Sequence, residues 1–248
     1  MKPKNKWIEM TKAILIALFA ALILRQFVIA SYNVPTGSMK DTILVGDFMF
    51  VNKFIYGART PVWVGIPFTG IGAEVPFYQF PAISEPQRND ILVFDWPNPE
   101  RPADRSTDYI KRCVAVGGQT VEVRGESLFI DGQPEGQLVD QGVKYDIEDK
   151  QNVKYTGVLA SNHKKYSIRH YTRTFHSRSF GPEQVPPGNF FMMGDNRDNS
   201  LDSRSWKFVS RDRVGGKPLM IWLSWDGQVP GYMFYEKIRW DRLGEIVR

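Results

Sequence analysis

The longest apolar run of the chain lies close to its N-terminus, where residues 13–24 read AILIALFAALIL. Twelve residues of α-helix reach only about 18 Å, which is short of the ~30 Å hydrocarbon core of a bilayer. Extended to residues 7–30, the segment reaches about 36 Å as a helix. The extension includes Glu9 and Lys12, which fit a headgroup zone, and Arg25, which can snorkel to the far surface. The pattern therefore predicts one transmembrane helix.

Lysines at positions 2, 4 and 6 precede this run. Under the positive-inside rule they place the N-terminus in the cytoplasm and the rest of the chain on the outer side of the membrane. A cleaved signal peptide is the alternative, because it also has a basic start and a short apolar region. Its cleavage motif is poorly developed here, with IAS at 29–31 as a weak candidate, so we favour a retained single-pass anchor.

Beyond residue 30 the pattern changes to short runs rich in Val, Ile, Phe and Tyr, separated by Gly and Pro, which is typical of β-structure. We expect a strand pair within ILVGDFMFVNKFIYG at 43–57 and a hairpin within TVEVRGESLFIDG at 120–132. Further strands are expected in four apolar segments, at 90–97, 108–118, 189–195 and 218–225. Residues 58–88 are rich in Pro, Gly and aromatic residues and show no regular pattern.

These segments predict a mainly β protein, in which an N-terminal transmembrane helix is followed by an antiparallel β-sheet domain. Residues 133–187 are polar and weakly patterned, which indicates an inserted smaller lobe of strands and loops. The expected organisation is a basic tail and anchor over 1–30, the first part of the β domain over 31–132, the inserted lobe over 133–187, and the second part of the β domain over 188–248.

Charge and rare residues limit the chemistry that the chain can perform. The formal net charge of +5 suits nucleic acid or anionic lipid, but no helix-turn-helix, zinc-finger or RNP-like motif is present. Cys113 is the single cysteine, so neither an internal disulfide nor a Cys/His metal cluster is expected. The three histidines, at positions 163, 170 and 176, share one polar stretch, and we expect no metal or other cofactor.

Several common catalytic motifs are absent or incomplete. The sequence has no G-x-S-x-G and no H-E-x-x-H. The S-x-x-K formed by Ser161 and Lys164 lies in the polar insert and lacks its S-D-N and K-T-G companions. The Asp-rich stretch 195–202 lacks the glycine and glutamate spacing of an EF-hand calcium loop.

Three short segments combine the residues that catalysis needs. PTGSM at 35–39 places a serine beside a glycine, where its hydroxyl and backbone N–H can face one substrate oxygen. YIKR at 109–112 lies in an expected strand, so Lys111 and Arg112 face opposite ways. GDNRDNSLDSR at 194–204 is dense in charges and hydroxyls, which indicates a hydrogen-bonded network that holds a site in shape.

In this order behind an N-terminal anchor, the segments resemble the signature boxes of the bacterial type I signal peptidases, a family of Ser-Lys dyad serine proteases. The stretch at 194–204 matches almost residue for residue, whereas Ser38-Met39 and YIKR resemble the nucleophile and general-base boxes. The likeness covers most of residues 7–132 and 188–215. It is weak across 58–88 and 133–187.

The resemblance implies roles for individual residues. Ser38 would attack the scissile carbonyl as the nucleophile, and Lys111 would accept its proton as the general base. Thr36 would supply a hydroxyl to the oxyanion hole, and Ser200 would orient the lysine. Tyr109 would be the aromatic residue beside the lysine, and Asp202 and Arg204 would form a supporting ion pair. Alone, each would be an ordinary turn serine, solvated lysine or loop cap, but their joint occurrence favours the catalytic interpretation.

A Ser-Lys dyad is physically sound without histidine. A lysine acts as a base only when it is neutral, and at the usual lysine pKa of ~10.4 only about one molecule in 2,500 is neutral at pH 7. Burial that lowers this pKa to ~8 raises the neutral fraction to about one in ten, at a cost of about 3 kcal/mol. We therefore expect an apolar pocket around Lys111.

The sequence departs from the family pattern at four positions. Asp41 stands where proline is usual, Asn89 and Lys207 stand where glycine is common, and Thr36 is a rarer choice than serine. None of them belongs to the dyad. The departures affect the expected loop geometry and, through it, the range of substrates.

The resemblance also implies partners and location. Substrates would be secreted preproteins with small residues at the first and third positions before the cut, bound as an added β-strand. The enzyme would act as a monomer in the bacterial inner membrane, with its catalytic domain on the periplasmic side. The aromatic segment 63–80 would either enter the lipid interface or pack as a loop.

Two other functions stay open at this point. One is a Ser-Lys protease that processes itself or one dedicated envelope partner. The other is a non-catalytic anchored domain that binds envelope proteins. Turnover of a preprotein in trans would separate these two from a signal peptidase.

Overall fold

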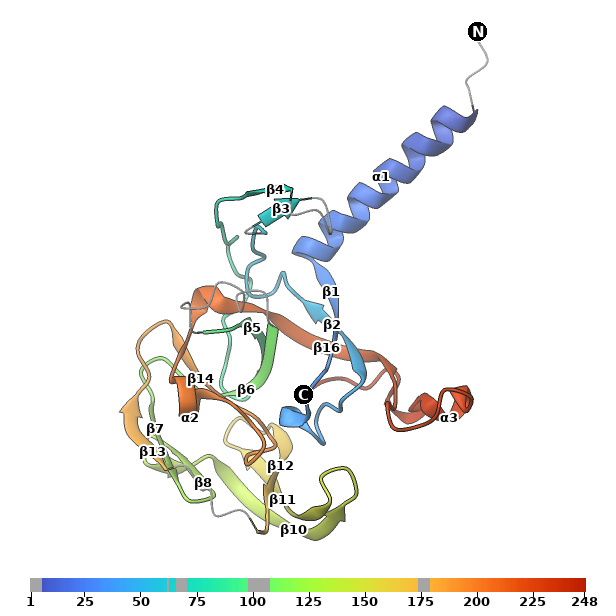
Figure 1. Cartoon of the computed structure of the whole chain (residues 1–248). Coiled ribbons are helices and arrows are strands. Elements are labelled where there is room, and N and C mark those ends of the chain that lie inside the picture. Colours follow the sequence, from blue (N-terminus) through green and yellow to red (C-terminus); the bar gives the residue numbers. More distant parts are fainter. Residues whose placement is uncertain (1–5, 62, 66–70, 98–107, 174–178) are drawn as a thin grey trace.

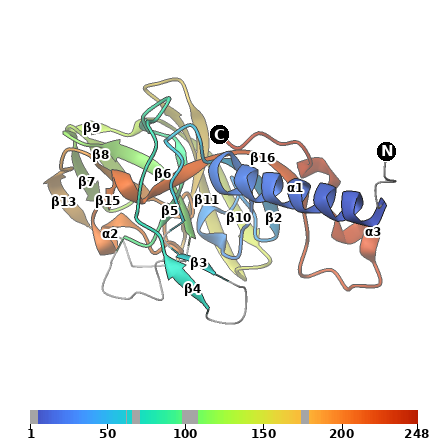
Figure 2. The same ribbon diagram turned by 90° about the horizontal axis from the view of Figure 1, so that it is seen from above.

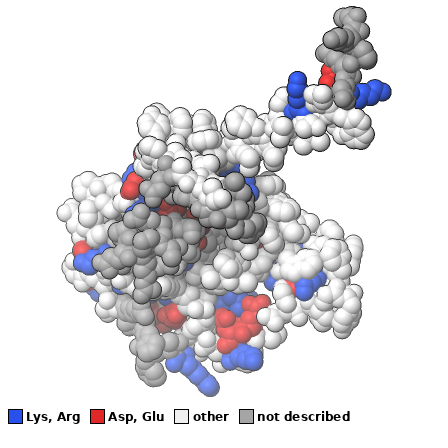
Figure 3. Space-filling view, turned by 45° about the horizontal axis from the view of Figure 1, so that its top comes forward, with Lys and Arg blue, Asp and Glu red and all other residues white. Residues whose placement is uncertain are grey.

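The computed structural model describes residues 6–61, 63–65, 71–97, 108–173 and 179–248 (Figure 1). Its first element is helix α1, Lys6–Phe27, which projects away from the rest of the chain and buries none of its side chains. The helix is long and apolar enough to cross a membrane. In Figure 3 charged side chains gather toward the free end of the projecting part, where the sequence has Lys6, Glu9 and Lys12.

A seven-stranded antiparallel sheet forms the centre of the molecule (Figure 1). In spatial order its strands are β1 (Ile29–Asn33), β2 (Asp47–Asn52), β16 (Val214–Ser224), β5 (Ile91–Asp95), β6 (Asp108–Val116), β14 (Asn189–Met193) and β15 (Val209–Ser210). The four single strands predicted from apolar segments correspond to β5, β6, β14 and β16, so they are confirmed. The mainly β, antiparallel fold class is confirmed with them.

The strand pair predicted within residues 43–57 is wrong, because this segment supplies only β2. The Asn52 side-chain oxygen accepts hydrogen bonds from the N–H groups of Phe54 and Ile55, at 2.9 and 3.0 Å, and turns the chain directly after the strand. The partner of β2 on one side is instead β1, which follows the helix. An apolar run that continues from a helix into a strand gives no signal of where one ends and the other begins.

Three smaller sheets complete the described chain. The predicted hairpin is confirmed as β7 (Thr120–Arg124) and β8 (Ser127–Ile130). These strands share a sheet with β9 (Gln133–Pro134) and β13 (Phe180–Gln184), whereas β3 (Trp63–Gly65) and β4 (Gly72–Glu74) pair alone. The short helices are α2 (Ser203–Trp206) and α3 (Phe234–Lys237), with 3₁₀ turns at Gly37–Met39, Arg211–Arg213 and Trp240–Arg242.

The third small sheet contains β10 (Gly136–Asp146), β11 (Gln151–Ala160) and β12 (Lys165–Tyr171). Residues 133–187 therefore contribute to two sheets, because β13 returns to β7. Figure 1 places β10–β12 at the end of the molecule away from α1. Figure 2 shows the sheet of β7, β8 and β13 on the opposite side of the molecule from α3.

One hydrophobic cluster lies between the central sheet and the turn that carries Ser38. Its buried members come from the whole length of the chain: Val34, Met39, Ile43, Met49, Val51, Ile91, Val93, Ile221 and Val247. Each such side chain contributes roughly 1.5–3 kcal/mol when it is fully buried. The cluster thus fixes the backbone on which the candidate site is built.

Candidate active site

Ser38 lies in a 3₁₀ helix of one turn, Gly37–Met39, and lines a cleft. The Lys40 N–H closes this turn by donating to the Gly37 carbonyl over 3.1 Å. Met39 is fully buried in the cluster below, so the neighbouring serine is held at the surface of the core and is only 7% exposed. The hydroxyl is therefore presented to the cleft by an anchored backbone.

Lys111 lies on β6 and reaches this hydroxyl. Its Nζ is 2.7 Å from Ser38 Oγ and 3.0 Å from the carbonyl oxygen of Ile110, and the residue is 3% exposed. The next side chain, Arg112, points the other way, and its Nε and Nη2 donate to the Asp195 carboxylate at 2.8 and 2.7 Å. The alternation of a β-strand thus gives two adjacent basic residues separate partners.

Burial lowers the pKa of Lys111 to about 8, against a smaller opposing effect of the Asp202 and Asp195 carboxylates. Among the described residues, no carboxylate lies within ion-pair distance of its Nζ. Because burial penalises the charged form of an amine, this surrounding favours the neutral one. At a pKa near 8, about one molecule in ten is neutral at pH 7, which suits a general base.

Two of the expected supporting residues, Thr36 and Tyr109, differ in their surroundings. Thr36 is exposed, lines the cleft, and makes no capping hydrogen bond with its hydroxyl. Tyr109 is half-buried, and its ring centre lies 5.8 Å from Lys111 Nζ. The ring packs against Trp96 and Trp206, with centroid distances of 5.0 and 5.6 Å, so this aromatic group screens one side of the lysine from solvent.

Ser200 lies close to the nucleophile but has no hydrogen-bond partner for its buried hydroxyl within the part of the chain that the structure describes. The expected bond to Lys111 is thus not formed in this arrangement. A Cβ atom on Gly194 would lie 2.3 Å from Ser200 Oγ and 2.5 Å from the Ser38 carbonyl oxygen. This close approach of Ser200 and the Ser38 backbone explains why residue 194 carries no side chain.

Asp202 and Arg204 form the ion pair that the resemblance implied. Arg204 Nε and Nη2 donate to the two Asp202 oxygens, each at 2.8 Å. The carboxylate also accepts the N–H of Gly194 at 3.2 Å and caps α2 through the N–H of Arg204. The pair therefore ties the end of the third segment back to its start, directly after β14.

The cleft has a volume of about 630 Å³ and a lining that is partly polar and partly apolar. Ser38, Lys111 and Thr36 belong to its polar lining, and its apolar lining includes Met49, Val93, Ile110 and Leu201. Its lining also includes Tyr32 and Asn33 of β1, the strand at the end of the central sheet. An extended peptide placed there meets a strand edge with no partner among the described residues.

Sequence reasoning missed several residues that hold the turn of Ser38. Asn196 donates from its backbone N–H to the Ser38 carbonyl at 3.1 Å, and from its side chain to the Gly37 carbonyl at 3.0 Å. Thr42 donates to Asp195, at 2.6 Å, beside the buried Arg112 pair. The density of polar residues in the third segment predicted a network, but no spacing rule indicated which partner each group would take.

The departures from the family pattern have backbone consequences. Asn89 and Lys207 have φ angles of 69° and 70°, in the left-handed region that glycine occupies without strain. Asparagine tolerates this region better than lysine does. Asp41 has φ 79°, which a proline ring cannot adopt, so the loop after Ser38 follows a path that the usual proline would forbid.

Neither the histidines nor the Asp-rich segment forms a competing centre in the described chain. The cleft lining contains no histidine, and His176 lies outside the described residues. Asp195, Asp198 and Asp202 each accept hydrogen bonds from protein groups. No group of three or more potential metal ligands occurs among the residues that the structure describes.

Comparison with known proteins agrees with this arrangement. A family model described as signal peptidase, peptidase S26, matches residues 7–225. Signal peptidase I of Pseudomonas fluorescens is 34% identical over 229 residues, covering 88% of this chain and 73% of that protein. Signal peptidase I of Aquifex aeolicus is 30% identical over 243 residues, covering 86% and 82%.

A crystal structure of a signal peptidase I from Enterococcus faecalis is 28% identical and covers 55% of this chain and 98% of that one, with a TM-score of 0.32. That score is too low to support a conclusion about the fold. The family model and the two relatives match most of the chain, and these matches establish its family. The chain belongs to the signal peptidase family of serine peptidases, peptidase S26.

Proposed function

We propose that this peptidase removes N-terminal signal peptides from exported preproteins with Ser38 as nucleophile and Lys111 as general base. The observation that carries the proposal is the 2.7 Å separation of Ser38 Oγ and Lys111 Nζ, at a site where the pKa of Lys111 falls to about 8. A nucleophile within hydrogen-bond reach of a base that is partly neutral at pH 7 is what acyl transfer requires.

In the first step, neutral Lys111 takes the proton of Ser38 Oγ as that oxygen bonds to the scissile carbonyl carbon. The resulting oxyanion faces the Ser38 backbone N–H and the exposed Thr36 hydroxyl, which is free of a capping bond. Such preorganised donors stabilise the tetrahedral intermediate. When it collapses, the protonated Lys111 gives its proton to the leaving amine, and the mature protein departs.

The acyl-enzyme is then hydrolysed by the same groups in reverse order. Lys111 takes a proton from a water molecule, whose oxygen attacks the ester carbonyl of Ser38. Collapse of the second intermediate returns the proton to Ser38 Oγ and releases the signal peptide as a carboxylate. Tyr109 and its aromatic neighbours limit water around the lysine, so its pKa stays low through the cycle.

The substrate is proposed to lie as an added strand between β1 and the start of β6. Tyr32 and Asn33 lie on the open edge of β1, and residues 108–111 of β6 precede the first residue that pairs with β14. Backbone pairing would hold the peptide extended, and the apolar lining of the cleft would receive the small side chains before the cut. Since every proposed site residue comes from one chain, a monomer is sufficient.

We infer that α1 anchors the enzyme in the bacterial inner membrane, with its N-terminus in the cytoplasm and its catalytic part outside. The apolar length of the helix and its lysine-flanked start support this orientation. In the aromatic segment 63–80, Phe77, Tyr78 and Phe80 are exposed, and Phe80 contacts Phe27 at the base of α1. This placement supports contact of the segment with the lipid interface; the side chain of Trp63 lies outside the described residues.

The decisive experiment is preprotein cleavage by the detergent-solubilised full chain between pH 6 and 10, beside Lys111→Ala as the matched variant. We expect wild type alone to cut at the signal junction, with a rate that rises through an apparent pKa near 8. This direction follows because deprotonation of Lys111 creates the base. Equal cleavage by Lys111→Ala would eliminate the dyad, and a folded wild type that cuts no preprotein would eliminate the proposed function.

A further inference from the structure

The loop that continues from Ser38 carries two charged residues in succession, Lys40 and Asp41. Lys40 is buried, with 10% of its side chain exposed, although it lies only two residues beyond the nucleophile. Asp41 holds the loop in the left-handed backbone conformation described above. Neither residue belongs to the dyad or to the ion pair of the third segment, so the proposed mechanism leaves both unexplained.

Lys40 is held by the turn that joins β10 and β11. Its Nζ lies 2.7 Å from Glu148, 2.9 Å from Asp146 and 3.5 Å from Asp149. Burial alone would lower the pKa of Lys40, but hydrogen bonds to Glu148 and Asp146 raise it above the usual value. The lysine therefore stays charged, in contrast to Lys111.

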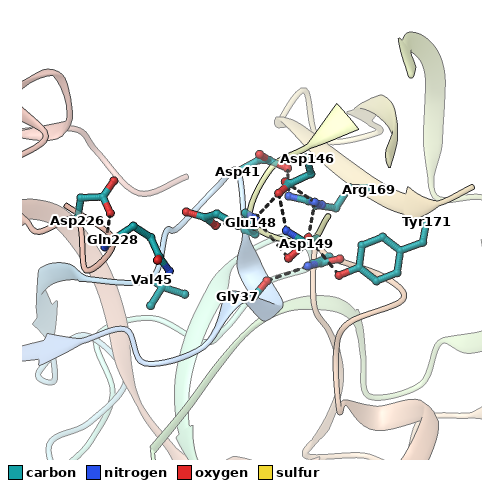
Figure 4. Close-up of polar contacts among 12 residues, drawn as sticks. Gly37, Asp41, Val45, Asp146, Glu148, Asp149, Arg169, Tyr171, Asp226 and Gln228 are labelled. Atoms are coloured by element: carbon teal, nitrogen blue, oxygen red, sulfur yellow. Dashed lines mark hydrogen bonds and ion pairs between the residues drawn. The ribbon is translucent and has the colours of Figure 1, made fainter. Parts of the chain in front are cut away.

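Arg169 of β12 completes the contact from the other side (Figure 4). Its Nη2 donates to Asp146 and Asp149, each at 2.7 Å, and its Nη1 lies 3.3 Å from Asp41. The side chain is 1% exposed. Figure 4 shows the carboxylates of Asp41, Asp146 and Asp149 converging on this guanidinium. We call the six residues Lys40, Asp41, Asp146, Glu148, Asp149 and Arg169 the clasp.

The backbone of Arg169 ties the clasp to the third segment as well. Its N–H donates to the Asp195 carbonyl and its carbonyl accepts the Arg197 N–H, both at 3.0 Å. Between those two residues, Asn196 holds the carbonyls of Gly37 and Ser38. Arg169 is thus connected to the turn of Ser38 in two ways. Its side chain binds Asp41 and Asp146, and its backbone holds the segment that contains Asn196.

We propose that the clasp positions Ser38 against Lys111, so that the sheet β10–β12 acts on the reaction without touching the substrate. The proposal rests on the proposed function of the dyad. Ser38 is carried by a single 3₁₀ turn, which has few hydrogen bonds of its own. A displacement of about 1 Å between reacting groups can reduce a rate by about 100-fold, so small movements of this turn matter. Lys40 and Arg169 are accordingly positioning residues.

The test compares Lys40→Met with Lys154→Met in the detergent-solubilised full chain. Lys154 of β11 lies in the same small sheet and pairs with Glu126 at 2.9 Å. The two side chains are 41% and 52% exposed, in contrast to the buried Lys40. For Lys40→Met, with active sites counted by burst titration, we expect kcat to fall about 10- to 100-fold and KM to change less than about 2-fold. Lys40→Arg should recover most of kcat, and Lys154→Met should resemble wild type.

Amide hydrogen exchange supplies a readout that does not depend on turnover. We expect protection of residues 37–43 to fall at least about tenfold in Lys40→Met and to stay unchanged in Lys154→Met. Unchanged kcat and unchanged protection in Lys40→Met would overturn the proposal, as would an equal loss in Lys154→Met. If Lys40→Met does not fold, the milder Glu148→Gln decides, with a kcat about 2- to 5-fold lower expected and wild-type kcat contradicting it.

Failure of the clasp can be told apart from failure of the dyad. If wild type and Lys111→Ala cut preprotein equally, the dyad fails, while the exchange experiment still decides whether the clasp orders the loop. If Lys111→Ala is inactive and Lys40→Met keeps full kcat per active site, the dyad stands and the clasp has no catalytic role.

Discussion

Two buried lysines, Lys40 and Lys111, lie close to Ser38 in the chain or in space, and the protein compensates their burial in contrary ways. Lys111 contacts a hydroxyl and a carbonyl, and its pKa falls to about 8 because burial dominates. Lys40 contacts three carboxylates, and its pKa rises despite burial. A desolvated ammonium group needs compensating charge unless the protein gains from losing its proton.

The difference separates groups that hold the loop from groups that react. In their proposed roles, Lys40 depends on a charge that it keeps, whereas Lys111 depends on a proton that it can lose. The carboxylates of Asp195 and Asp202 act against the fall in the pKa of Lys111, but each of them is bound to an arginine. Arg112 and Arg204 thereby keep these acids from pairing with the base.

The largest effect should follow from breaking the dyad itself. Ser38→Ala and Lys111→Ala should each lower kcat by at least about 1,000-fold, since groups that act as a unit are lost together. Lys111→Arg should fail equally, because a guanidinium keeps its proton at neutral pH. Single-turnover cleavage of a preprotein measures these rates, with thermal unfolding as the check on the fold. A Lys111→Arg enzyme with more than a tenth of wild-type activity would contradict the general-base role.

A stability measurement should sharpen the contrast between the lysines. Between pH 8 and 10.5 the unfolded chain binds more protons at Lys111 than the folded chain does, so this residue makes stability rise with pH. At pH 7 its burial costs up to about 3 kcal/mol, which Lys111→Met would recover. Lys40→Met should instead destabilise, by about 1–3 kcal/mol, because the buried Asp146 carboxylate loses the ammonium group and keeps only Arg169 as a charged partner.

Denaturant unfolding of both variants in detergent, at pH 7 and at pH 10.5, measures these free energies. The gain from Lys111→Met should shrink at the higher pH, where the wild-type lysine is largely neutral in the folded state and about half neutral in the unfolded state. A destabilised Lys111→Met at pH 7 would mean that its contacts to Ser38 and Ile110 outweigh the desolvation of its charge.

The smallest effect is expected at Ser200. Its hydroxyl has no partner among the described residues in the free enzyme, so it can assist Lys111 only after a rotation of its side chain. Ser200→Ala should lower kcat by about tenfold or less and leave KM unchanged. The measurement is steady-state preprotein cleavage. Ser203→Ala is the control for loss of a neighbouring hydroxyl, because the Ser203 hydroxyl accepts the N–H of Met192 and donates no bond toward the dyad. An unchanged kcat in Ser200→Ala would remove this serine from the site.

The sequence was informative where the structure of a short segment depends on residues within that segment. The strands β5, β6, β14 and β16 and the hairpin β7–β8 were predicted because apolar periodicity and turn residues are local signals. Strand β1 was missed, since the apolar run of α1 continues into it. The roles of Ser38 and Lys111 stay predictions that the geometry supports.

The clasp lay beyond sequence reasoning for a different reason. Asp146 and Arg169 are separated from Lys40 by more than a hundred residues and lie in a polar insert with weak patterning. Ion pairs across such distances leave no periodicity and no fixed spacing. Asp41 was noticed as a departure from the family pattern, but its meaning depended on a backbone angle and on the guanidinium that faces it.

The cluster beneath Ser38 has a consequence for the order in which the molecule can assemble. Val34 and Met39 pack there with Val247, and the neighbouring Ile246 pairs with Met220. Contacts between residues so far apart along the chain form late and slowly during folding, because loop closure must come first. We therefore expect the turn that carries Ser38 to reach its position against Lys111 only after the segment with Ile246 and Val247 has packed.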